Sequence, residues 1–441
     1  MIQSIPDKPA PSRRIEVLAG ISTFLATMYI IVVNPAILSQ SGLPFSGVLT
    51  ATVLLSFFSS LMMGLYARNP IVVAPGMGLN AFFTFSAVKG MDISPSVALG
   101  AVFWAGILFL LLSLANIRTA IVHAIPKPLR YAVSAGIGLF ITLIGFENAR
   151  FIVANPATLV SLANISDPII LTFIFGLLLT AVLIVRRVTG AIIVGIMLTT
   201  FAAIPIGRLW GDATAVNSGQ KTLVNFQGLF AAPDFSLIGS LDLLGALQWS
   251  LWPVIFAFAF TDLFDSLSTF VGVAEAANLY DETGEPRNVK QSLLTDAVAT
   301  TLAGVLGTSP GTAYIESAVG IEQGGRTGLT AIVAGSLFLP FLFLSPLLSV
   351  IPAIATAPAL VLVGSFMMRP VTKINWGKLD EAIPAFLALV LIPFSYSITQ
   401  GIIWGFLSWT IIKVAVGKYD EVPVGLWVVD IFCVLSLVAG H

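Results

Sequence analysis

Two hydrophobic segments of this chain are interrupted by proline and glycine, and each carries a polar residue between its apolar flanks. The first, residues 71–80 (IVVAPGMGLN), ends in Asn80, and the second, residues 308–317 (TSPGTAYIES), contains Glu316. Unpaired backbone groups and buried carboxylates are costly in lipid, so both segments must line a cavity enclosed by protein. Interrupted segments at corresponding places in two halves of a chain point to the binding site of a secondary transporter. The sequence therefore predicts a transporter.

The composition excludes a water-soluble globular protein. Of the 441 residues, 57% are hydrophobic and 10% are charged, whereas soluble domains carry about 25% charged residues. The net charge of −1 gives no indication of a nucleic-acid partner, and we expect none. Cys433 is the only cysteine, which excludes an intrachain disulfide and a thiolate metal cluster. The two histidines, His123 and His441, lie in an expected loop and at the C-terminus, so we expect no metal and no cofactor.

Apolar runs long enough to cross a bilayer recur in both halves of the chain. We expect an all-α polytopic membrane protein with seven spans in each half, the third and tenth of them broken. The spans are expected at residues 15–38, 47–66, 71–88, 94–114, 128–147, 168–187, 189–207, 247–272, 290–306, 312–321, 327–351, 353–370, 381–397 and 400–416. An odd number of spans inserts the second half upside down, which is the inverted-repeat arrangement. The apolar tail 424–438 carries Asp430 and lies at the interface or packs against the last span.

The positive charges divide unevenly between the two sides that this topology predicts. With a cytoplasmic N-terminus, 17 of the 21 Lys and Arg residues lie on the inner side or in the segments that face it. The outer side holds Lys89, Arg150, Arg208 and Lys221. Positively charged residues concentrate on the cytoplasmic side of membrane proteins. We therefore expect a multi-pass protein of the cell (inner) membrane with residues 1–14 as a cytoplasmic tail.

The span 247–272 contains two acids where lipid should exclude them. Asp262, Asp265 and Thr269 are spaced i, i+3, i+7, which places them on one helical face. A charged Asp at the bilayer centre costs about 2.5–3.5 kcal/mol on insertion scales, and no Lys or Arg is expected at matching depth. The structural alternative is a stripe that only pairs with a neighbouring helix. The functional interpretation is a cavity that uses the acids for substrate and proton, and Asp296 in the next span is a further candidate for the proton path or else a helix-end residue.

The two broken segments predict short extended pieces that lead into half-helices with free N–H groups. Ala313 and Tyr314 precede Glu316 in the second segment and are candidates for substrate contact together with it. Asn80 lies one turn inside the first half-helix, where it contacts substrate or acts as a capping or packing residue. The aromatic candidates for stacking on a ligand are Phe82 and Phe264, although most aromatic residues in a span face lipid or the core.

The expected cavity thus combines carboxylates, an amide, backbone donors and aromatic rings, without a fixed positive charge. Such a site suits a flat, neutral, hydrogen-bonding ligand and is poor for an inorganic anion. Two carboxylates close together in a low-dielectric site titrate as a unit and share a proton, which is a natural coupling device. The residues alone indicate a proton-coupled carrier of a small, polar, uncharged molecule, with Asp265, Asp296 and Thr269 on the coupling side.

Several motifs in the right order resemble those of a known family, from about residue 13 to the end of the chain. These motifs are Asn69-Pro70-x4-Pro75-Gly-Met-Gly-Leu-Asn80-Ala-Phe-Phe, Asp262-Leu-Phe-Asp265-Ser, Tyr314-Ile-Glu316-Ser-Ala and the run 324–330, Gly-Gly-Arg-Thr-Gly-Leu-Thr. They resemble the AzgA-like purine permeases of the nucleobase–ascorbate and nucleobase–cation symporter-2 superfamily. The chain departs from the pattern at Ser268, where glycine is expected, and at Glu322-Gln323, where smaller residues are expected, which bears on the choice among purines.

The resemblance implies a fold of fourteen spans in two inverted repeats, residues 15–207 and 244–441, joined by an extracytoplasmic connection, 208–243. It implies a core domain of spans 1–4 and 8–11, a gate domain of spans 5–7 and 12–14, and short antiparallel strands in spans 3 and 10. It also implies proton-driven uptake of adenine, guanine or hypoxanthine by movement of the core against the gate, and a homodimer formed through the gate domains.

The resemblance also implies roles for individual residues. Asp262 and Glu316 would hold the substrate, Asn80 would complete the site, and Asp265 would serve coupling. Three alternatives remain open: a transporter of the same fold for uracil or xanthine, an anion carrier of the related sulfate-transporter fold, and a membrane-embedded acid–base enzyme. Glu316 argues against the anion carrier. Asp262 and Asp265 share one helix, whereas intramembrane aspartyl hydrolases place their acids on different helices.

Overall fold

The computed structural model describes residues 12–114, 125–214, 220–226, 228–277, 279–280 and 286–439. The expected cytoplasmic tail 1–14 therefore lies, apart from its last three residues, outside the described part of the chain. The first half contains the helices α1 (Arg13–Thr27), α2 (Ile30–Leu38), α3 (Phe45–Met62), α4 (Met77–Ala81), α5 (Pro95–Leu114), α7 (Lys127–Asn148), α8 (Pro168–Val185) and α9 (Ala191–Ala203). The second half contains α10 (Trp252–Ala277), α11 (Val289–Leu306), α12 (Ala318–Glu322), α13 (Gly328–Ser336), α14 (Ser345–Leu348), α15 (Ala353–Met367), α16 (Leu379–Phe394), α17 (Ile398–Ala415) and α18 (Val424–Ala439).

Short π- and 3-10 helices extend or connect several of these elements. The π-helical pieces η2 (Met63–Ala67) and η3 (Phe82–Lys89) continue α3 and α4. The 3-10 pieces are η1 (Ser39–Ser41), η4 (Gly245–Leu247), η5 (Trp249–Leu251), η6 (Ile315–Ser317), η7 (Leu339–Phe343), η8 (Arg369–Lys373) and η9 (Tyr419–Glu421). Every predicted span overlaps a helix or a strand–helix unit. Eight helical segments among the described residues are long and apolar enough to cross a membrane, so the count of fourteen crossings stays a prediction.

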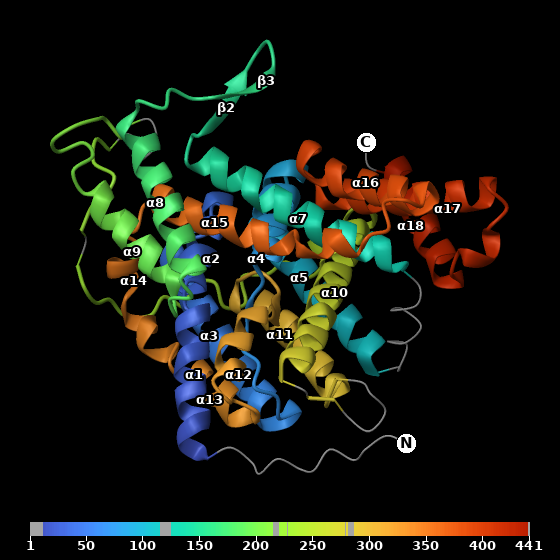
Figure 1. Cartoon of the computed structure of the whole chain (residues 1–441), viewed down its shortest axis with the longest axis horizontal. Coiled ribbons are helices and arrows are strands. Elements are labelled where there is room, and N and C mark those ends of the chain that lie inside the picture. The colour runs from blue at the N-terminus through green and yellow to red at the C-terminus, as the bar shows by residue number, and fades with distance from the viewer. Residues whose placement is uncertain are drawn as a thin grey trace.

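The two broken segments meet as a two-stranded antiparallel sheet. Strand β1 (Val73–Pro75) pairs with β4 (Gly311–Ala313) in the register Val73↔Ala313 and Pro75↔Gly311. The predicted short strands in these two segments are confirmed. A second antiparallel pair, β2 (Ile152–Asn155) and β3 (Leu159–Leu162), was not predicted; it forms a hairpin that projects away from the helices (Figure 1).

The helices pack in two groups. In one group, α5 packs on α10 and α11, and α13 packs on α1 and α3; in the other, α7 packs on α15, α16 and α17, and α15 also packs on α8 and α9. Figure 1 shows α1 and α13 in the lower part of the view and α7, α16 and α17 across the upper part. Close contact within the first group depends on small residues, because a Cβ at Gly106 of α5 would lie 2.3 Å from the backbone nitrogen of Thr301 in α11.

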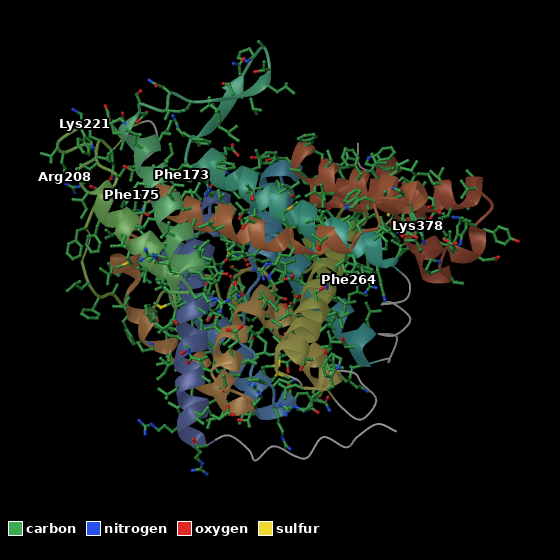
Figure 2. All side chains as sticks on the ribbon, viewed as in Figure 1. Phe173, Phe175, Arg208, Lys221, Phe264 and Lys378 are labelled. Atoms are coloured by element: carbon green, nitrogen blue, oxygen red, sulfur yellow. The ribbon has the colours of Figure 1, made fainter. Side chains whose placement is uncertain are left out.

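The outer helices expose large apolar side chains in the way that a lipid-facing surface requires. On α8, Phe173 is buried whereas Phe175 is 49% exposed, and Leu178 and Val182 are exposed as well. Figure 2 shows Phe173 and Phe175 on this peripheral helix, with Phe264 in the interior of the molecule. A contiguous apolar surface of this kind marks a membrane or interaction surface. The tail helix α18 packs against α17.

Candidate substrate site

The interruption of both segments leaves backbone groups that the protein itself satisfies. Gly76 N donates to Pro310 O at 3.0 Å, and Tyr314 N donates to Val72 O at 2.9 Å, so hydrogen bonds continue beyond the paired residues of the sheet. The hydroxyl of Ser60 accepts a hydrogen bond from Val73 N at 3.1 Å. The segments are therefore held by protein partners at a depth where lipid offers none.

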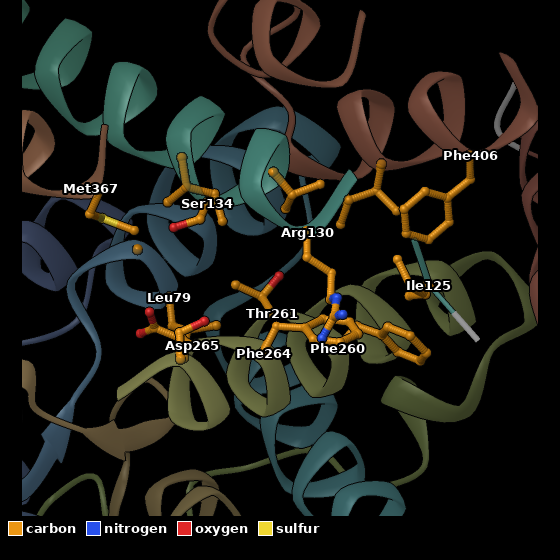
Figure 3. Close-up of a pocket in the computed structure, with 15 residues that line it drawn as sticks. Leu79, Ile125, Arg130, Ser134, Phe260, Thr261, Phe264, Asp265, Met367 and Phe406 are labelled. Carbon is orange, nitrogen blue, oxygen red and sulfur yellow. The ribbon is translucent and has the colours of Figure 1, made fainter. Parts of the chain in front are cut away.

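A cavity opens next to the first half-helix. It is lined by residues of α4, α7, α10, α15 and α17 and by Ile125 just before α7. Helix α10 contributes two neighbouring stripes: the rings of Phe260 and Phe264, and the polar side chains of Thr261 and Asp265 (Figure 3). Residues four apart lie on the same face of a helix, so Phe260 lies next to Phe264 and Thr261 next to Asp265. The cavity is thus aromatic on one stripe and hydrogen-bonding on the other.

The cavity contains a positive charge, which corrects the prediction that it would have none. Arg130, in the first turn of α7, lines it and lies over the ring of Phe264 with 5.6 Å between the guanidinium carbon and the ring centroid. In Figure 3 the side chain reaches from α7 toward Phe264 and Phe260. Sequence reasoning assigned Arg130 to the inner side by its position at a helix end. Its long side chain nevertheless brings the charge into the site.

The two acids of α10 have different surroundings. Asp265 lines the cavity, whereas Asp262 is fully buried and does not line it. Thr300 of α11 donates a hydrogen bond to Asp262 Oδ2, and the charges of Asp262 and Asp296 lie close enough to interact. Asp296 is also fully buried, and its carboxylate oxygens have no well-aligned hydrogen-bond partner among the described residues. Asp262 and Asp265 therefore do not share one cavity as predicted: Asp265 faces the cavity, and Asp262 is buried beside Asp296.

Glu316 lies in η6, directly after β4, and is partly exposed. Its Oε1 accepts a hydrogen bond of 2.7 Å from the hydroxyl of Tyr29, which lies at the break between α1 and α2. The charges of Glu316 and Asp265 also interact. Glu316 does not line the cavity described above, but it is electrostatically coupled to the acid that does. Sequence reasoning did not find Tyr29; the only signal was its position in the first span ahead of Asn34-Pro35.

Asn80 and Tyr314 are held by other parts of the protein. Asn80 is fully buried and its Oδ1 accepts a hydrogen bond of 2.5 Å from Ser309, next to the second break. Ser309 Oγ also lies 3.3 Å from Asn34 Oδ1, which places the first span beside both breaks. The hydroxyl of Tyr314 donates to Pro75 O at 2.5 Å across the sheet. These contacts match the packing alternative for Asn80, and they give Tyr314 a structural contact with β1.

The remaining predicted residues surround the site without lining the cavity. Phe82 is buried and packs on Phe258 of α10, with 4.5 Å between the ring centroids. Ala313 is buried in β4 opposite Val73, and Thr269 is buried one turn after Asp265. The cavity therefore brings together Phe264 and Asp265 from the predicted set and adds Phe260, Thr261 and Arg130.

The fold and the site define a polytopic membrane transporter, built around two broken segments that cross beside an aromatic, acid-bearing cavity. The chain belongs to the Permease family, whose model matches residues 14–403. The resemblance to purine permeases that the motifs indicated is therefore confirmed, and the chain is a multi-pass membrane protein and not an enzyme.

Relatives at substantial identity extend over almost the whole chain. It is 41% identical over 427 residues to the adenine permease AdeP of Escherichia coli (strain K12), covering 96% of this chain and 93% of that protein. It is 42% identical over 412 residues to the guanine/hypoxanthine permease PbuO of Bacillus subtilis (strain 168), covering 92% and 93%.

A solved structure shares the fold. The transmembrane domain of the cyanobacterium bicarbonate transporter BicA superposes with a TM-score of 0.65 at 15% identity, covering 89% of this chain and 97% of that chain. At this identity the similarity concerns the fold alone.

Proposed function

We propose that this protein imports a purine nucleobase by proton symport, with the cavity beside α10 as the substrate site. The observation that carries the proposal is the position of Asp265: an acid faces a cavity walled by the flat rings of Phe260 and Phe264. A planar, uncharged, hydrogen-bonding molecule fits such walls, because its faces stack on the rings and its N–H groups donate to the carboxylate. The names of the relatives, adenine and guanine/hypoxanthine permeases, support the same class of substrate.

The packing of the helices supports alternating access between a core and a gate. The cavity receives α4 and α10 from the group that contains both broken segments, and α7, α15 and α17 from the other group. We assign spans 1–4 and 8–11 to a core domain and spans 5–7 and 12–14 to a gate domain. Movement of the core relative to the gate would open the cavity to one side of the membrane at a time.

We assign the acids different roles in substrate binding and in proton coupling. Asp265 faces the cavity, where it contacts substrate and exchanges the coupling proton, and Glu316 completes the site when the core moves. Asp262 and Asp296 hold a proton between them, because two buried carboxylates with interacting charges are not readily both ionised. Thr269, one turn after Asp265, and Asn80, through Ser309 beside the second break, position these groups. A cytoplasmic N-terminus, placement in the inner membrane and a homodimer formed through the gate domains complete the proposal.

Uptake by purified protein in proteoliposomes tests this function. Radiolabelled hypoxanthine, guanine and adenine are each supplied outside, with an inward proton gradient, an inward sodium gradient, or neither. We expect accumulation of hypoxanthine, guanine or adenine that depends on the proton gradient, and no accumulation of uracil or sulfate. Uptake of uracil or sulfate in place of purines would assign another substrate to this fold, and purine uptake that follows only the sodium gradient would contradict proton coupling.

A further inference from the structure

We propose that Arg130 recognises a carbonyl oxygen of the substrate, so that the site prefers oxopurines such as hypoxanthine and guanine over adenine. This inference rests on the proposed function and adds to it the chemical class of the purine and the residue that selects it.

The guanidinium of Arg130 lines the cavity, and its Nε has no hydrogen-bond acceptor among the described residues. Its Nε is shielded from solvent and has no hydrogen-bond partner, and within the described part of the chain no carboxylate lies within 4 Å of it. Its contact is the ring of Phe264, which holds the flat guanidinium at 5.6 Å from the ring centroid. A shielded N–H donor without an acceptor is costly unless a ligand supplies one.

The hydrogen-bonding geometry of arginine selects among the purines. A guanidinium presents parallel N–H donors, which match the neighbouring carbonyl oxygen and ring nitrogen of guanine; adenine offers an amino donor at the position of that oxygen. If adenine faced Arg130, its amino group would meet the guanidinium N–H groups, so that two donors would oppose each other. Good two-bond contacts of this kind discriminate between bases by about 5- to 150-fold.

The polar stripe of α10 supplies hydrogen-bond acceptors that complement the donors of Arg130. Thr261 Oγ1 is buried without a hydrogen-bond partner in the described residues, and Asp265 lies one turn further along the same face of α10. The ring N–H beside the carbonyl of an oxopurine donates to a carboxylate, whereas the corresponding nitrogen of adenine is an acceptor. One oxopurine held against Phe260 and Phe264 could thus accept hydrogen bonds from Arg130 of α7 at its carbonyl oxygen. The same molecule could donate its ring N–H to Asp265 of α10.

The first experiment compares uptake of hypoxanthine and adenine by the wild-type protein and by three variants in proteoliposomes. The variants are Arg130→Gln, Arg130→Lys and, as matched control, Lys127→Gln, which removes an exposed charge one turn earlier on α7. We expect the wild type to have a lower KM for hypoxanthine. Arg130→Gln should raise that KM about 5- to 150-fold while changing the KM for adenine by less than about threefold. The KM of Arg130→Lys for hypoxanthine should lie between those of the wild type and Arg130→Gln. The KM of Lys127→Gln for both purines should equal that of the wild type.

A second measurement, on the wild type alone, covers the case in which an Arg130 variant fails to fold. Binding of hypoxanthine is compared with binding of unsubstituted purine, which lacks the carbonyl, and of 7-deazahypoxanthine, which lacks the adjacent ring acceptor. We expect each analogue to bind at least about fivefold more weakly. A wild type that prefers adenine, an equal loss of both purines in Arg130→Gln, or equal binding of the analogues would overturn the role of Arg130 while leaving purine transport intact. Transport of neither purine by the wild type would overturn the proposed function itself.

Discussion

The hydroxyl of Tyr29 donates a 2.7 Å hydrogen bond to Oε1 of Glu316, joining the break in the first span to the break in the second half. The two residues lie far apart in the sequence, and the rings of Tyr29 and Tyr314 also approach, with 6.4 Å between their centroids. One carboxylate oxygen of Glu316 is therefore fixed by the protein.

Removal of this hydroxyl is expected to weaken substrate binding more than stability. A hydrogen bond to a charged group contributes about 1.5–3 kcal/mol, so Tyr29→Phe should lower affinity for the preferred purine about 10- to 100-fold. Binding is measured on purified protein by calorimetry and stability by thermal unfolding in detergent. Tyr66→Phe, at a tyrosine that is 50% exposed, is the control and should bind normally. Normal binding by Tyr29→Phe would contradict a role for this contact in the site.

Neutralisation of the cavity-facing acid is expected to separate binding from accumulation. Asp265→Asn keeps the size of the side chain and a hydrogen-bond acceptor but cannot exchange a proton. We expect exchange of labelled for unlabelled purine to persist, while accumulation driven by a proton gradient falls at least about tenfold. Asp420→Asn, at an exposed acid in η9, should accumulate purine as the wild type does. Normal accumulation by Asp265→Asn would remove this acid from coupling.

Asn80 distinguishes a packing role from a substrate role. Asn80→Ala leaves the buried hydroxyl of Ser309 without its 2.5 Å acceptor, which should lower the free energy of unfolding by about 1–3 kcal/mol. If Asn80 acts through packing, the double variant Asn80→Ala/Ser309→Ala should recover part of this stability, because both partners are then apolar. A loss of affinity without any loss of thermal stability would instead indicate direct contact with substrate.

The buried lysine of α17 is expected to depend on its acidic partners. Lys413 Nζ lies 2.9 Å from Asp380 and 2.5 Å from Glu421, and its side chain is 1% exposed. Asp380→Asn should lower the free energy of unfolding by about 1.5–3 kcal/mol, measured by thermal or chemical unfolding. Lys378 is 60% exposed in its pair with Glu381, so Lys378→Gln should change stability by less than about 1 kcal/mol. Equal effects of the two substitutions would contradict the importance of burial here.

The connection between the halves should add stability that depends on pH. Hydrogen bonds from Ser46 and from the backbone of Ser236 hold the pKa of Asp234 below its ordinary value. A carboxyl with a lowered folded-state pKa stabilises the fold above its unfolded pKa of about 3.9, and this contribution is lost as pH falls through the folded pKa. The wild type should therefore melt at a higher temperature than Asp234→Asn near neutral pH, and the difference should narrow below about pH 4. A difference independent of pH would assign the effect to packing.

The sequence predicted the backbone of the site better than its side-chain contacts. Proline and glycine at Pro75, Gly76 and Gly311 cannot continue a helix at these places, so both breaks and the strands were predictable. The spacing of Asp262 and Asp265 located the correct helix. It could not separate their surroundings, because residues three apart are about 60° apart on a helix of 3.6 residues per turn and can face different neighbours.

Two side chains of the candidate site were missed for different physical reasons. Arg130 lies at a helix end, where topology rules assign a charge to the membrane surface, and only its length and its stacking on Phe264 bring it into the cavity. Tyr29 acts across the boundary between the two halves, and no local pattern records a partner so distant in sequence. The β2–β3 hairpin was missed because the stretch from 152 to 162 is too short to resemble a span.

The pairing of β1 with β4 has a consequence for the synthesis and membrane insertion of the protein. The ribosome delivers β1 long before β4, and the bilayer contains nothing that can bond to an extended backbone in the interval. We therefore expect β1 of the nascent chain to stay in the insertion machinery or at the membrane–water interface until β4 has been synthesised. The transport pathway can for this reason be completed only after residue 311 has been synthesised, and a chain truncated before it would leave β1 without its partner strand.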